Sequence, residues 1–261
     1  DDASWRAPVL AFCGTIVFYT YMRLARMNHP ELSGSTHMQW FRRNKRSMIA
    51  LAVGCAIAGA ITAFSIAIKL IGALWPVALI AALYVVPPVL VSGRTIGLRR
   101  IPVLKAFLIA LVWSWTVVQL AAVCGDGYED MLEPWYAILQ FCFFLSLAFT
   151  FDVRDLPHDM KSLRTLPQLI GANGAKVFAA LMQLPWVLYF VMLAWISVDP
   201  IENQTAKGFL VLPMMIPCLG QLITIGLIAR ATPQRSDRFW SFWLDGTLIL
   251  IPLLGWVGSM F

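Results

Sequence analysis

The sequence predicts an all-α membrane protein, a polytopic bundle of transmembrane helices. Of its 261 residues, 59% are hydrophobic and 13% are charged, and the mean hydropathy is +0.73. Soluble domains carry about 25% charged residues, roughly twice this share. The apolar residues form repeated runs of about 20, the length that crosses a bilayer as a helix. The runs lack the period-two alternation of a membrane β-barrel, so helices are the expected spans.

Eight such runs are expected to form one transmembrane domain over residues 1–261. Charged residues separate the runs. Basic residues follow the first, second, third and seventh runs. Acidic residues follow the fourth run, the fifth, where they form an aspartate cluster, and the sixth, where the sequence reads "VDPIEN". The runs cover residues 8–27, 47–68, 73–92, 104–124, 135–153, 174–197, 208–229 and 243–261.

Charge in the connections predicts the orientation. Connections near residues 28–46, 93–105, 154–173 and 230–242, with the adjoining helix ends, hold 17 of the 20 Lys and Arg residues. The positive-inside rule makes these four connections cytoplasmic, in an inner or plasma membrane. The net charge of +6 therefore reflects topology and contact with membrane lipids, and no nucleic-acid partner is expected. Because the chain opens "DDASW" without an initiator Met, further residues are expected upstream of Asp1.

The candidate site is the stretch "FDVRDLPHDMKSLRTLPQLIG", residues 151–171. Asp152, Asp155 and Asp159 stand at offsets 0, 3 and 7, the spacing of one helical face, although Pro157 is expected to break the helix. Crowded carboxylates at a membrane boundary are tolerable where a cation compensates them, and their oxygens suit Mg²⁺.

Two basic residues extend this stretch, and their role is open between two interpretations. Lys161 and Arg164 could contact a phosphate or diphosphate. Alternatively the segment is a self-neutralising loop end, in which Arg154 and Lys161 pair with the aspartates.

The same stretch resembles the second aspartate-rich motif of the UbiA superfamily of intramembrane prenyltransferases. The matching residues are Asp152, Asp155, Asp159, Lys161, Thr165, Leu166, Pro167 and Gly171. The resemblance implies that the eight spans correspond to helices two to nine of the family's nine. It also implies that the three aspartates ligate Mg²⁺ and are catalytic, while Lys161 and Arg164 bind an isoprenyl diphosphate. The implied reaction is prenyl transfer to an aromatic or lipid acceptor.

The family's first aspartate motif is not matched. "NHPELSG", residues 28–34, resembles the sequence that follows that motif, but the expected aspartates are replaced by "TYMRLAR". Arg23, with Arg42, Arg43 and Arg46, could then meet diphosphate directly and leave a single Mg²⁺ site. Alternatively the bundle is a catalytically degenerate structural or lipid- or quinone-binding subunit of a larger membrane complex. A transporter is a third class, although no convincing internal repeat is found.

The five cysteines are scattered over the predicted spans without CxxC spacing or a histidine partner, so neither a zinc site nor a redox pair is predicted from them. Intramembrane glutamines, among them Gln183 and Gln221, are expected to make interhelical hydrogen bonds.

Overall fold

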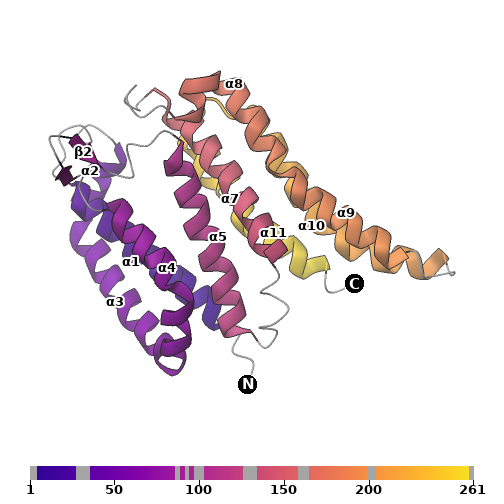
Figure 1. Cartoon of the computed structure of the whole chain (residues 1–261), viewed down its shortest axis with the longest axis horizontal. Coiled ribbons are helices and arrows are strands. Elements are labelled where there is room, and N and C mark those ends of the chain that lie inside the picture. The colour runs from indigo at the N-terminus through magenta and orange to yellow at the C-terminus, as the bar shows by residue number, and fades with distance from the viewer. Residues whose placement is uncertain are drawn as a thin grey trace. The chain divides into compact units, whose positions relative to one another are not determined.

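The computed structural model describes residues 5–27, 36–85, 89–91, 94–96, 103–125, 134–157, 165–198 and 204–258 (Figure 1). The regular elements among these residues are helices apart from one short hairpin. The chain divides into two compact units, which are described separately. Unit 1 comprises Asp1–Pro87 and Trp115–Ala137, and unit 2 comprises Pro88–Ser114 and Ile138–Phe261. The single transmembrane domain stays a prediction.

Long apolar helices make this a membrane-embedded protein. Within the ranges that the structure describes, five segments are long and apolar enough to cross a bilayer: Arg6–Leu24, Lys45–Ala81, Leu104–Cys124, Pro134–Asp155 and Leu166–Ile196. Two further apolar helices, Met215–Arg230 and Phe239–Gly255, are shorter. Large apolar side chains stand on the outside, with Phe64 85% and Ile68 88% exposed. Such surfaces are stable against lipid tails and costly in water.

Unit 1 is built around the pairing of its first and third helices. Its elements are α1 (Arg6–Arg26), α2 (Thr36–Arg43), α3 (Lys45–Ala63), the short 3₁₀ helix η2 (Phe64–Ile66) and α4 (Ala67–Val85). α1 lies along α3, as Figure 1 shows. A small core of Leu70, Leu120 and Val123 adds the second half of α5 (Leu104–Cys124). The Trp115 indole N–H donates to the Ala73 carbonyl at 2.8 Å and ties α5 to α4.

The boundary between the second and third predicted spans lies earlier than the sequence indicated. The predicted boundary lies between residues 68 and 73, whereas the helix tightens at η2, between α3 and α4. Lys69 thus lies within the first turn of α4. Likewise α4 ends at Val85 instead of residue 92, shortly before the prolines at positions 87 and 88, a residue type that cannot continue a helix.

A hairpin follows in place of the predicted end of the third span. Strand β1 (Val89–Val91) pairs antiparallel with β2 (Arg94–Ile96), with Val89 opposite Ile96 and Val91 opposite Arg94. The prediction of a helical span rested on the apolar character of this stretch, whereas its β-branched residues favour a strand.

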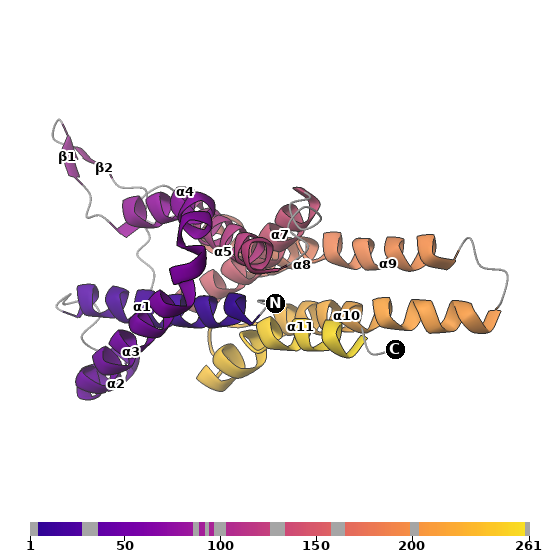
Figure 2. The same ribbon diagram turned by 90° about the horizontal axis from the view of Figure 1, so that it is seen from below.

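Unit 2 holds the larger core. Its elements are the first half of α5, then α7 (Pro134–Asp155), α8 (Leu166–Leu181), α9 (Leu184–Val198), α10 (Gln204–Arg230), the π-helix η5 (Phe239–Leu244) and α11 (Thr247–Gly258). Figure 2 shows α9 running beside α10, and α11 also packs against α10. Phe149, Ile228, Trp240 and Leu244 are buried where α7, α10 and η5 meet.

The sixth predicted span is two helices rather than one. Pro185 is tolerated in the first turn of α9 but lacks the N–H that would continue α8, so the helix breaks at Met182 and Gln183. At the break the Gln183 side chain donates to the Ser146 hydroxyl at 3.0 Å. That hydroxyl donates to the Ala179 carbonyl at 2.6 Å. The interhelical hydrogen bond expected for Gln183 is therefore confirmed.

α8 also begins earlier than predicted, at Leu166 instead of residue 174. The N–H of Thr165, the residue before the helix, donates to the Gln168 side-chain oxygen at 3.2 Å. Pro167 suits a first turn, where its missing N–H costs nothing. Within the helix Gly171 has φ 79° and ψ 161°, a conformation that essentially only glycine adopts, and it kinks α8.

Replacing Gly171 by alanine is expected to destabilise the protein by about 1–3 kcal/mol through backbone strain alone. No atom lies within 4 Å of the added methyl group, so crowding does not contribute. Gly226→Ala is the matched control: its site in α10 is equally open and its φ is not in the left-handed region. The control should be neutral or stabilising by up to about 1 kcal/mol. Thermal unfolding of both variants in detergent measures the loss of stability. Equal losses for Gly171→Ala and Gly226→Ala would contradict the requirement for glycine at position 171.

Candidate functional site

The candidate site is the end of α7. α7 ends at Asp155, two residues before Pro157, and the chain turns at Leu156 and Pro157. This confirms the predicted helix break and follows from the steric restriction that proline imposes on the residue before it. Asp152 and Asp155 consequently both lie in the last turn of α7, at the end of a helix that is apolar over most of its length.

Asp152 is buried and paired with a lysine from another helix. The Lys105 Nζ lies 3.0 Å from the Asp152 Oδ1, and the two side chains are 26% and 4% exposed. Lys105 stands in the first turn of α5 and Asp152 in the last turn of α7, so each charge is at the end of a helix whose dipole disfavours it. The ion pair offsets both penalties and fastens the start of α5 to the end of α7.

The backbone just before Lys105 is strained. Val103 has φ 62°, and a β-branched residue in this region is a true outlier. Its carbonyl accepts the N–H of Ala106 at 3.1 Å, which starts the first turn of α5. Strain of this kind costs about 1–3 kcal/mol and is retained where surrounding contacts fix the conformation. Here packing of Val103 against the unit 2 core sets where α5 begins, and so where Lys105 stands.

Asp155 is paired with its neighbour Arg154 in a more exposed setting. Arg154 Nε lies 2.7 Å from Asp155 Oδ1 and Nη2 lies 3.2 Å from Oδ2. The guanidinium also stands over the rings of Phe151, at 4.9 Å, and Trp240, at 6.0 Å. Arg154 further acts electrostatically on Asp245, at the end of η5. The pairing of Arg154 with an aspartate, one of the two interpretations open from the sequence, is therefore present for Asp155.

The described residues do not by themselves fit a magnesium site. Within the part of the chain that the structure describes, no three His, Cys, Asp or Glu side chains gather closely enough to hold a metal ion. Asp152 faces Lys105, and Asp155 faces Arg154. Mg²⁺ needs oxygen ligands in near-octahedral geometry, whereas here the Lys105 ammonium contacts one Asp152 oxygen and the Arg154 guanidinium contacts both Asp155 oxygens.

Three predicted site residues, Asp159, Lys161 and Arg164, lie outside the described residues. Their roles as metal ligand and diphosphate contacts stay predictions.

The four arginines proposed to replace the missing first motif all belong to unit 1, whereas the α7 aspartates belong to unit 2. Arg23 lies over the Phe41 ring at 5.8 Å, and Arg42 donates to the Met27 carbonyl. Arg43 and Arg46 are exposed. Their joint action with the α7 aspartates on one ligand stays a prediction.

Lys105 is the functional residue that sequence reasoning passed over, because it was counted among the basic residues of the connection near 93–105. The signal that could have found it is its position in the first turn of an apolar helix, where the dipole disfavours a cation. A lysine there requires a nearby carboxylate or a solvated end.

Comparison with known proteins adds no relative to this description: no family model, curated protein or solved structure matches the chain. The site is therefore defined by its own geometry and by the sequence pattern of residues 151–171.

Lys105→Met is expected to destabilise the protein by about 2 kcal/mol, because the cation 3.0 Å from a nearly buried carboxylate is lost. Asp155→Asn, in a pair that is about one-third exposed, is expected to cost less than about 1 kcal/mol. Chemical unfolding in detergent compares the two variants. If the cost of combining Asp152→Asn with Lys105→Met equals the sum of the costs of the two single variants, the pairing carries no coupling energy.

Proposed function

We propose that this chain is a UbiA-like membrane protein that binds the anionic head of an isoprenyl diphosphate or a prenylated lipid at the end of α7. In this proposal binding relies on cationic side chains, and the bundle serves as a lipid- or quinone-binding subunit rather than as a metal-dependent transferase. The supporting observation is that both described aspartates of the motif already face basic groups.

The site gathers charge in an otherwise apolar part of the molecule. Lys105, Asp152, Arg154 and Asp155 lie at the joined ends of α5 and α7, next to aromatic rings and above the apolar core of unit 2. Lys105 and Arg154 keep 26% and 40% of their side chains exposed, so a phosphate oxygen can reach them. Charge-assisted hydrogen bonds to phosphate are among the strong ones, particularly from a guanidinium. The apolar helices below suit a prenyl tail.

The proposal includes a multi-pass topology with the site on the cytoplasmic side. The eight spans would be α1, α3, α4, α5, α7, α8 with α9, α10, and η5 with α11. Within unit 2 the basic residues support this orientation. Lys105 stands at the start of α5 and Arg154 at the end of α7, and the Arg154 guanidinium lies over Trp240 of η5. Arg235 stands shortly before η5, and its Nε donates to the Arg230 carbonyl at 3.1 Å. Basic residues on one side of a bundle are typical of its cytoplasmic face.

Binding of geranylgeranyl diphosphate to the protein in detergent with EDTA tests the proposal. We expect Lys105→Met and Arg154→Met each to weaken binding about tenfold or more, because each removes a charge-assisted contact worth about 1.5 kcal/mol. Asp155→Asn should not weaken binding, because it removes negative charge beside the ligand. The matched control is Lys176→Met in α8, whose Nζ contacts the Ala229 carbonyl. Binding that strictly requires Mg²⁺, or that ignores both basic substitutions, would refute this mode.

Magnesium-dependent prenyl transfer is the second candidate, favoured by one observation. Asp152 and Asp155 stand on the last turn of α7, followed by a turn and then by α8 starting after Thr165, an arrangement that suits the aspartate motif of the prenyltransferase resemblance. In that reading Asp159 adds a third carboxylate, and the ion, when bound, would stabilise the departing diphosphate.

The two candidates differ in turnover. If the protein is a transferase, Mg²⁺-dependent release of diphosphate from an isoprenyl diphosphate should fall by about 100-fold or more in Asp155→Ala, because transition-state charge stabilisation is lost. Diphosphate release and mass spectrometry of prenylated products provide the measurement. Release that continues unchanged in Asp155→Ala would exclude this role for the aspartate, and no release with any donor would leave the binding function.

A further inference from the structure

Unit 1 contains a pair of cysteines that are far apart in the sequence and close in the fold. Cys13 lies on α1 and Cys55 on α3, the two helices whose pairing organises this unit. Both are free thiols, and they are 6% and 7% exposed. Their side chains are within hydrogen-bonding reach of each other. The scattered cysteine positions in the sequence gave no indication of this pair.

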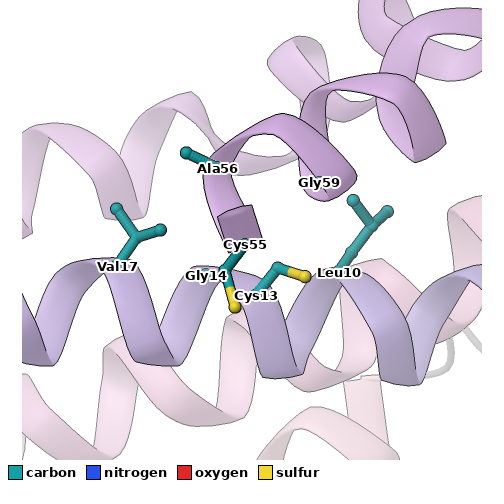
Figure 3. A pocket seen from close by; sticks show the side chains of 7 residues that line it. All are labelled: Leu10, Cys13, Gly14, Val17, Cys55, Ala56 and Gly59. Carbon is teal, nitrogen blue, oxygen red and sulfur yellow. The ribbon is translucent and has the colours of Figure 1, made fainter. Parts of the chain in front are cut away.

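The thiols line a groove between the two helices. Figure 3 shows both sulfur atoms in this groove, together with the small residues Gly14, Ala56 and Gly59. The groove has a volume of about 220 Å³, and Leu10 and Val17 also line it. Apart from the two thiols its walls are apolar, so the species that reach it are those dissolved in the membrane.

The two helices approach each other closely beside the thiols. A Cβ placed on Gly59, one helical turn beyond Cys55, would lie 3.4 Å from the Cys13 Cβ. Because the Cys13 and Cys55 side chains are within hydrogen-bonding reach on these closely packed helices, a disulfide between them needs no separation of α1 from α3.

We propose that Cys13 and Cys55 form a membrane-embedded dithiol that is oxidised to a disulfide by a quinone entering the apolar groove. Two S–H bonds break and one S–S bond forms. The two electrons and two protons pass to the quinone, whose two carbonyl groups become the hydroxyl groups of a hydroquinone. This is a site on unit 1, separate from the charged site of unit 2, and the resulting bond ties α1 to α3 covalently.

Duroquinone tests this proposal, because its fully substituted ring disfavours addition of thiols to carbon. After treatment of the reduced full-length chain in nanodiscs, the five free thiols should fall to three and the mass should drop by about 2 Da. Peptide mapping should give a Cys13–Cys55 crosslink, with stoichiometric hydroquinone. Five remaining thiols, a quinone adduct or crosslinks among other cysteines would each overturn the proposal.

Variants separate the pair from general thiol oxidation. Cys13→Ser and Cys55→Ser should abolish hydroquinone formation, whereas Cys218→Ser, which removes a similarly buried cysteine of unit 2, should leave it unchanged. Gly59→Leu, which fills the groove while keeping both thiols, should slow oxidation about tenfold or more because oxidation depends on access. Unchanged oxidation in Gly59→Leu, or in either serine variant, would exclude the groove as the site. The readouts do not involve diphosphate binding, so they stand apart from the proposed function.

Discussion

The ion pair between Lys105 and Asp152 is the interaction on which unit 2 depends. Both charges stand at helix ends whose dipoles oppose them, and Asp152 is almost fully withdrawn from solvent. Neither residue is tolerable in that place without compensation. Together they hold the start of α5 against the end of α7. Val103 keeps its strained φ because this ion pair and the packing against the core fix the backbone on both sides of it. The charged site and the packing of the apolar helices of unit 2 therefore depend on each other.

The same constraint governs how an anionic ligand would be received. A phosphate near the end of α7 meets two basic groups that are already held by carboxylates, so it competes with aspartates rather than with water alone. That competition lowers affinity, but it also favours ligands of high charge density, and diphosphate is such a ligand. Arg154 gains additional restraint from Phe151 and Trp240, so its guanidinium is partly oriented before any ligand arrives.

The sequence predicted the features that depend on composition and local chemistry. Apolar runs located most helices, and Pro157 marked the end of α7. The sequence did not predict the break at Gln183 or the early start of α8. An apolar stretch of this length has the pattern of one span, and Pro185 alone does not show whether the helix breaks or only bends there. Partners from distant segments were also hidden. The pairing of Lys105 with Asp152 and of Cys13 with Cys55 depends on helix packing, which periodicity does not encode.

The break between α8 and α9 has a consequence for motion. The Gln183 side-chain oxygen is buried there without a hydrogen-bond partner, which costs about 1–3 kcal/mol at the point where backbone hydrogen bonding is already interrupted. Because the backbone hydrogen bonds are interrupted there, α8 and α9 can bend relative to each other more easily at Gln183 than within either helix. The hydrogen bond from Gln183 to Ser146 of α7 and the packing of α9 on α10 limit that bending.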